Sequence, residues 1–235
     1  MLVGRDGVVV GAYHKVFPVF GCPDEGGGDC DYATGEQGVA PGWAGVGVFS
    51  LDFGRISLLT CFDINFPELW HEAYALGSEL VVWPSAMNSS SDPSAPSYAR
   101  LHQYHVAGVG TPGTVYQPTG VAMPVTVPNA SLPLLKLVSI DLDASWAHWD
   151  NNREKVHTLL AENPAVKLVV PGPPFYYLQA TAPGVSVRAL FAKYKIESAR
   201  NYILRSRIGL NKIRAAGSCV LPGHGDPLCG GGDEV

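Results

Sequence analysis

The sequence has few charged residues, no basic cluster and no long apolar run. Charged side chains make up 16% of its 235 residues, and the formal net charge is −5. Without a Lys/Arg-rich run, neither nucleic acid nor an anionic membrane is expected as the main partner. No apolar stretch reaches the roughly 18 residues of a membrane-spanning helix. The N-terminal stretch MLVGRDGVVVGAY contains Asp6 and no small-residue cleavage site, so no signal peptide is visible and a cytoplasmic location is favoured.

Cysteine is also scarce. The five cysteines are an odd number and too sparse for a disulfide framework in a chain of this length. Four of them lie in loops rich in Gly, Pro and Asp, at Cys22, Cys30, Cys219 and Cys229. Cys61 differs because it ends the apolar run ISLLT. The pattern therefore singles out Cys61 and predicts that the other four are unremarkable surface thiols.

The segment around Cys61 has the pattern of a strand, a helix and a second strand. Residues 56–60 are apolar apart from two small hydroxyl side chains, which predicts a strand buried on both faces. Pro67 suits the first turn of a helix, which Gly77 should end. Residues 79–83 (ELVVW) are mostly apolar again. This order predicts a βαβ unit and hence an α/β fold.

The rest of the chain shows shorter patterns of the same kinds. A loop is expected where Gly, Pro and Asp gather, and a disordered tail is expected from Gly217 onward. The loop covers 21–45, and strands are expected at 8–10, 46–49 and 137–142. Helices are expected at 97–106 and at 151–162, the second of them capped by Asp150. Two basic amphipathic helices are expected within 184–214, and Ser186 can cap the first.

Cys61 stands where nucleophiles gather in α/β proteins, at the carboxyl end of a strand and before a tight turn. Such a turn would lift the sulfur out of the core, as the nucleophile elbow does for serine. The backbone N–H of Phe62 would then face the same space as a donor for a developing oxyanion. The pattern leaves one alternative open, a buried and inert cysteine, because free cysteine is often buried.

A thiol nucleophile needs a base and a group that favours the thiolate. Lys15 follows the apolar stretch VVVGAY and is expected at a strand end, and Glu36 lies in the Gly-rich stretch GEQGVAPG. Each residue taken alone is more typical of a solvated side chain. Their combination with Cys61 makes both of them candidate site residues. His102 and His105 share one face of the helix expected at 97–106, but no further ligand is spaced to complete a metal site, so no metal is predicted.

Three stretches together resemble the carbon–nitrogen hydrolase family, the nitrilase superfamily: YHKVFPVFG, EQGVAPG and FGRISLLTCFDINFPELWHEAYALGSELVVWPSA. The resemblance covers residues 1–160 well and 184–214 loosely. It implies an α/β fold of the nitrilase type, an α-β-β-α sandwich that usually dimerises through a helix face, and a catalytic set of Glu, Lys and Cys with no cofactor. It assigns Cys61 as the nucleophile, Lys15 as the cation that stabilises the tetrahedral intermediate, and Glu36 as the second glutamate of the set.

The turn and the resemblance together give supporting roles to three residues near the cysteine. Phe62 would supply the oxyanion N–H, Asp63 would accept hydrogen bonds that fix the turn, and Glu68 would be structural at a helix N-terminus, where a carboxylate is favoured.

The chain departs from the family's pattern at its N-terminal end. The family's general-base glutamate precedes the lysine, but no Glu precedes Lys15 in this sequence. The sandwich is therefore expected to be N-terminally incomplete, with the C-terminal portion of a carbon–nitrogen hydrolase domain over 1–180, a helical extension over 181–216 and a disordered tail over 217–235. This chain alone is expected to show little or no hydrolysis, because the group that takes the thiol proton is missing.

These observations predict a hydrolase of non-peptide carbon–nitrogen bonds in small amides or nitriles, acting through a thioester on Cys61 and assembled as a homodimer. The alternative is an inactive, truncated paralogue that acts as a binding or dimerisation scaffold. A papain-type cysteine protease does not fit, because the local signatures of that class are absent around Cys61 and around the histidines.

Overall fold

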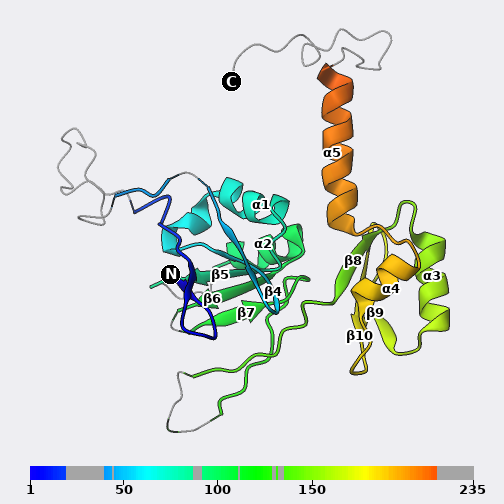
Figure 1. Ribbon diagram of the computed structural model, residues 1–235, viewed down its shortest axis with the longest axis horizontal. Helices are drawn as coiled ribbons and strands as arrows, with labels where there is room; N and C mark the ends of the chain where they lie inside the picture. Colours follow the sequence, from blue (N-terminus) through cyan, green and yellow to red (C-terminus); the bar gives the residue numbers. More distant parts are fainter. Residues whose placement is uncertain are drawn as a thin grey trace. The chain divides into compact units, whose positions relative to one another are not determined.

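The chain divides into two compact units, Met1–Leu142 and Asp143–Val235 (Figure 1). The computed structural model describes residues 1–19, 40–43, 45–86, 92–110, 112–128, 131 and 135–215. Each unit packs helices against a sheet, so the predicted α/β class is confirmed. The domain limits at 180 and 216 that the sequence suggests stay predictions, and the tail expected from Gly217 lies outside the described residues.

The first unit is built on a five-stranded sheet with the order β3-β4-β5-β6-β7. Its three central strands are parallel and its two edge strands pair antiparallel. Burial of Ile56, Val81 and Val106 explains why the central strands are apolar runs. The strands are β3 (Val48–Leu51), β4 (Gly54–Leu58), β5 (Leu80–Pro84), β6 (His105–Val109) and β7 (Thr114–Tyr116), and a separate hairpin joins β1 (Leu2–Val3) to β2 (Val9–Gly11).

Two helices connect the parallel strands and lie on the same side of the sheet (Figure 1). A short 3₁₀ helix, η1 (Cys61–Asn65), and α1 (Pro67–Ala75) lead from β4 to β5, and α2 (Ser94–His102) leads from β5 to β6. Because both crossovers run in the same direction along the sheet, their common right-handedness places both helices on one face. The predicted start at Pro67 and end before Gly77, whose φ is +90°, are confirmed.

The helix expected at 97–106 is wrong at its C-terminal end. α2 ends at His102, Gln103 adopts a left-handed conformation with φ of +57°, and His105 begins β6. Val106 pairs with Val81 in the parallel ladder and is fully buried, whereas Leu101 is 70% exposed. Pairing with β5 and burial of Val106 therefore outweigh the helical spacing of this stretch.

The second unit contains a three-stranded antiparallel sheet with the order β8-β10-β9. Helices α3 and α4 pack their apolar stripes on this sheet around Val156, Leu159 and Phe191. The helix cap predicted at Ser186 is confirmed, since its hydroxyl accepts from the Ala189 N–H at 3.1 Å. The elements are β8 (Ser145–His148), α3 (Arg153–Glu162), β9 (Val166–Pro171), β10 (Phe175–Ala180), α4 (Val187–Lys193) and α5 (Ala199–Ala215).

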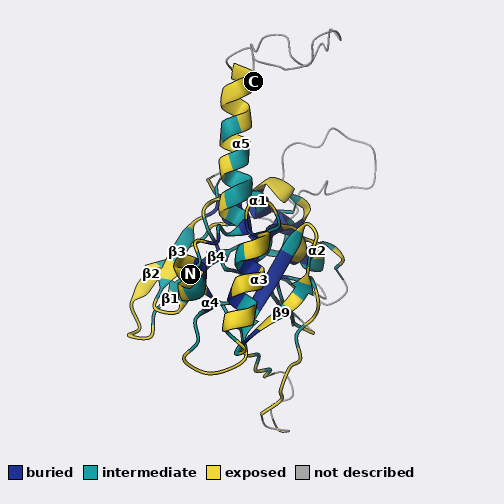
Figure 2. Ribbon diagram, turned by 90° about the vertical axis from the view of Figure 1, so that its right-hand side faces the viewer, coloured by how far each residue is buried: buried dark blue, intermediate teal, exposed yellow. Residues whose placement is uncertain are grey.

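Other local expectations are corrected. α3 begins at Arg153 with Asn152 as its N-cap, not Asp150. The strand expected at 137–142 does not form: Leu137 makes only an isolated antiparallel bridge to Thr126. α5 is exposed or partly buried beyond Ala199 (Figure 2). Within the described part of the chain, no helix has both the length and the apolar character needed to cross a membrane.

Candidate active site around Cys61

The turn after β4 presents Cys61 in an unusual backbone conformation. Cys61 has a φ of +48°, in the left-handed region that non-glycine residues adopt at a cost of about 1–3 kcal/mol. The residue is half-buried and opens η1 three positions after the end of β4. Positive φ at this point bends the chain away from the strand direction, as the sequence predicts for a nucleophile elbow.

A carboxylate two positions later holds this turn together. Asp63 is fully buried, and its side chain accepts three hydrogen bonds. One oxygen accepts from the Thr60 N–H and from the Tyr13 hydroxyl, both at 2.8 Å, and the other accepts from the Phe17 N–H at 3.0 Å. Three donors compensate for the burial of a charge that would otherwise be costly. These three hydrogen bonds agree with the predicted role of Asp63 as an acceptor that fixes the turn.

Two of the three donors on Asp63 come from the segment that contains Lys15. Tyr13 and Phe17 flank Lys15 by two positions on either side, and the Phe17 ring also stacks on Phe66 at a centroid distance of 3.5 Å. Lys15 is partly buried and lies beyond the end of β2 in a segment without regular structure, not directly at a strand end. The Lys15 carbonyl accepts from the Gly42 N–H at 2.7 Å. The structure therefore brings the backbone of the lysine segment to the cysteine turn.

Burial raises the pKa of Tyr13 well above its ordinary value, and the hydrogen bond to Asp63 raises it further. The Tyr13 hydroxyl is therefore protonated at any physiological pH and acts as a donor to the carboxylate. Nothing in the sequence near Tyr13 indicated this contact, because its partner lies 50 positions away.

Two indole rings support the same turn from the core side. Trp83 on β5 donates from Nε1 to the Cys61 carbonyl at 2.9 Å, and Trp70 on α1 donates to the Asp63 carbonyl at 3.1 Å. Both rings are fully buried and meet edge to face at 6.4 Å. These bonds tie the turn to two buried rings of the core, and the Asp63 carbonyl also accepts from the Phe66 N–H at 3.2 Å. The stretches ELWHE and VVWPS were visible in the sequence, but their role at the turn was not.

The remaining predicted site residues are placed as follows. Phe62 follows Cys61 in η1, is half-buried and contacts Phe66 edge to face at 5.7 Å. Glu68 is exposed in the first turn of α1, in keeping with a structural role at a helix N-terminus. Glu36 and the cysteines other than Cys61 lie outside the described residues.

The histidine pair is not a pair on one helix. His102 ends α2 and is buried against the rings of Tyr74, Tyr98 and Tyr104, whereas His105 begins β6. Burial lowers the pKa of His105 to about 4, so its ring is neutral at pH 7. In the described ranges no group of three or more His, Cys, Asp and Glu side chains could hold a metal ion.

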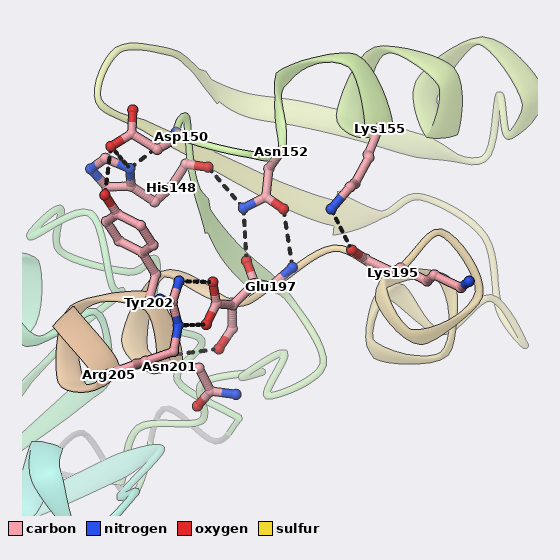
Figure 3. Close-up of polar contacts among 10 residues, drawn as sticks. His148, Asp150, Asn152, Lys155, Lys195, Glu197, Asn201, Tyr202 and Arg205 are labelled. Carbon is pink, nitrogen blue, oxygen red and sulfur yellow. Dashed lines mark hydrogen bonds and ion pairs between the residues drawn. The ribbon is translucent and has the colours of Figure 1, made fainter. Parts of the chain in front are cut away.

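The second unit has a polar cluster of its own (Figure 3). Asn152 is fully buried, donates to the His148 and Glu197 carbonyls, each at 3.0 Å, and accepts from the Glu197 N–H at 3.0 Å. Tyr202 stacks on His148 and donates to Asp150 at 2.6 Å. An open hollow beside this cluster is lined by Trp149, Asp150, Asn151, Arg153, Glu154, Lys155 and Tyr202. Its lining mixes charges of both signs and contains none of the site residues that the sequence predicts.

A thiol raised at the end of a central parallel strand, beside a segment that carries a lysine, is an arrangement suited to covalent catalysis in an α/β protein. Residues 1–113 match the model of the carbon-nitrogen hydrolase family. The matched part of the chain contains both Lys15 and Cys61.

Solved structures with partial similarity include amidases of the nitrilase superfamily. The NitN amidase from Nesterenkonia sp. AN1 is 20% identical, with a TM-score of 0.44 over 66% of this chain and 60% of that one. A mutant of the Nesterenkonia sp. AN1 amidase in complex with butyramide is 24% identical, with a TM-score of 0.33 over 36% of this chain and 38% of that one. Nit3 from Saccharomyces cerevisiae is 21% identical, with a TM-score of 0.40 over 50% of this chain and 44% of that one. The chain thus spans 38–60% of the length of these structures.

Proposed function

We propose that Cys61 is the nucleophile of a site that hydrolyses non-peptide carbon–nitrogen bonds in small amides or nitriles. The observation that carries the proposal is the left-handed turn at Cys61, which is tied through Asp63 to the segment containing Lys15. The family match over residues 1–113 supports the reaction class.

For an amide, the reaction proceeds in two displacements. The sulfur of Cys61 attacks the carbonyl carbon, so a C–S bond forms and the carbonyl oxygen takes up negative charge, which Lys15 and the Phe62 N–H stabilise. The C–N bond then breaks, and ammonia leaves with the proton that came from the thiol. Water attacks the thioester, releases the acid and restores the thiol. Glu36 is the candidate for the group that moves these protons, since a carboxylate can accept the thiol proton and later activate water.

The test is ammonia release from a panel of short-chain amides and nitriles by the 235-residue chain, alone and with an N-terminal extension that supplies a glutamate before Lys15. Cys61→Ala should abolish any turnover, and Lys15→Met and Glu36→Gln should each reduce kcat by about 10²-fold or more. Cys219→Ala is the matched control, since it removes a cysteine from a loop and should leave the rate unchanged. Turnover that survives Cys61→Ala would refute the proposal.

A second candidate is a non-catalytic scaffold that dimerises. It is favoured by a family match that ends at residue 113. Under this alternative, no substrate on the panel releases ammonia, while analytical ultracentrifugation finds a homodimer. Cys61-dependent turnover excludes it, and a monomer that shows no turnover with or without the extension leaves neither candidate standing.

A further inference from the structure

We propose that Tyr13 is a positioning residue for the Cys61 site: its hydroxyl locks the segment that carries Lys15 onto the turn that carries Cys61. The inference rests on the proposed function in one respect, namely that Lys15 and Cys61 act together. Its test below does not depend on turnover.

The Tyr13 hydroxyl joins two parts of the chain at a single atom. It donates to Asp63 at 2.8 Å and accepts from the Val16 N–H at 3.4 Å. The second bond closes a short loop within the segment itself, and that loop contains Lys15. The first bond fixes this loop to a carboxylate that lies two positions after Cys61. Any change at the hydroxyl therefore acts on the lysine loop and on the cysteine turn together.

The surroundings make this junction stiff. Val16 and Asp63 are buried, at 6% and 0% exposure, so water competes poorly for their polar groups. On the far side of Lys15, the Phe17 N–H also bonds to Asp63 at 3.0 Å. The bond from Phe17 uses a main-chain N–H, which every residue except proline has. The bond from position 13 needs a side chain long enough to bring a hydroxyl to Asp63. Tyr13→Phe removes that one oxygen and leaves the ring.

Tyr98 offers a matched control on the same turn. Its hydroxyl donates to the Ile64 carbonyl at 3.2 Å, so Tyr98→Phe also deletes one hydroxyl that bonds to η1. The Tyr98 bond reaches the turn from α2 and does not involve the lysine loop. The two deletions therefore differ in whether they release Lys15.

The experiment compares two alkylating reagents on Cys61 of the full chain, read by peptide mass spectrometry. Iodoacetate is negatively charged and iodoacetamide is neutral, so the ratio of their rates reports a positive charge beside the sulfur, while changes in thiol exposure affect both reagents. Lys15→Met should lower the ratio by about threefold or more, the effect of one charge at about 6 Å in a medium as polar as water. Tyr13→Phe should lower the logarithm of the rate ratio by at least half of the fall seen in Lys15→Met. Tyr98→Phe should leave the rate ratio unchanged.

An unchanged ratio in folded Tyr13→Phe, or an equal fall in Tyr98→Phe, would overturn the inference. So would an unchanged ratio in Lys15→Met, because Lys15 would then not face the sulfur. Should circular dichroism show that Tyr13→Phe is unfolded, Asp63→Asn replaces it. Loss of the Asp63 charge alone would raise the ratio, so a fall supports release of Lys15 and a rise or no change refutes it. A normal pattern of ratios without ammonia release would reject the proposed function and keep Tyr13 in its positioning role.

Discussion

Each of the two units of this chain buries a polar side chain that joins distant segments, a carboxylate in the first unit and an amide in the second. Asp63 and Asn152 are both fully buried and each makes three hydrogen bonds to groups of other residues. Asp63 connects partners up to 50 positions away, and Asn152 connects partners up to 45 positions away. The difference lies in what the partners offer.

All three partners of Asp63 are donors, namely one hydroxyl and two main-chain N–H groups. Asn152 meets two carbonyl acceptors and one N–H donor. Each side chain is therefore matched to its surroundings, and exchanging one for the other reverses at least one bond. The comparison teaches that the choice between acid and amide at a buried site follows from the partners' donors and acceptors, and four experiments can break or sharpen it.

The largest effect is expected from Asn152→Asp in the second unit. A carboxylate there would face the His148 and Glu197 carbonyl oxygens without a counter-charge, so we expect a loss of about 3–5 kcal/mol in the free energy of unfolding. Urea unfolding measures the loss, and hydrogen exchange should place it at β8 and α5. The control is Asn151→Asp, the same chemical change at an exposed neighbour. Equal stability of the two variants would show that the hydrogen bonds of Asn152 do not require an amide at this position.

The next effect is a dependence on pH in the first unit. Burial lowers the pKa of His105 to about 4, while the Glu79 carbonyl and Asp141 act in the opposite direction. The unfolded chain, with an ordinary histidine pKa, binds this proton first, so stability falls as the pH drops from about 6.5 to about 4, by about 3 kcal/mol in total.

His105→Gln should flatten this part of the stability profile, measured by urea unfolding at a series of pH values. His157→Gln, at an exposed histidine of the second unit, should leave the profile as it is. A profile that keeps its slope in His105→Gln would mean that another group is responsible for the acid sensitivity.

Asp63→Asn is the reciprocal substitution in the first unit and should cost about 2 kcal/mol. The amide keeps the shape of the side chain but turns an NH₂ group toward at least one N–H donor, which leaves that donor unsatisfied. Hydrogen exchange should quicken at Thr60 and Phe17 and not at β8. Asp52→Asn, at an exposed aspartate that pairs with Arg5, is the control. A protein as stable as the unaltered chain would show that the charge of Asp63 is not needed.

The smallest effect is expected at the surface of α5. Arg205 forms two bonds to the Glu197 carboxylate, at 2.9 Å and 2.8 Å, but its side chain is 61% exposed. Exposed ion pairs contribute little and are screened by salt. Arg205→Gln should therefore lower the melting temperature only slightly at low ionic strength, and the difference should vanish in 1 M NaCl. A large or salt-independent loss would show that Arg205 acts through packing instead.

The strand, turn and helix around Cys61 could be predicted because their signals are local. The apolar run before Cys61, Pro67 at a helix start and Gly77 after its end each act through neighbouring residues, and the same is true of the cap at Ser186. The end of α2 could not be predicted in this way. Its apolar and helical spacing continues past His102, and only pairing with β5 decides that the chain becomes a strand at His105.

The residues of the Cys61 site also divide into those that local patterns predict and those that only distant contacts reveal. Cys61, Lys15 and Asp63 could be selected from the sequence, because a strand end before a turn and a family's motif are patterns of neighbouring residues. Tyr13 and Trp83 acquired their roles at the Cys61 turn only in the folded chain, since the residues that they bond there lie 50 and 22 positions away. A hydrogen bond across such a distance leaves no periodic trace in one sequence, because nothing local requires the donor to be there. Sequence alone thus selected Cys61 as the candidate nucleophile, and the tertiary structure decided which residues hold its turn in place, because burial makes each unpaired polar group costly.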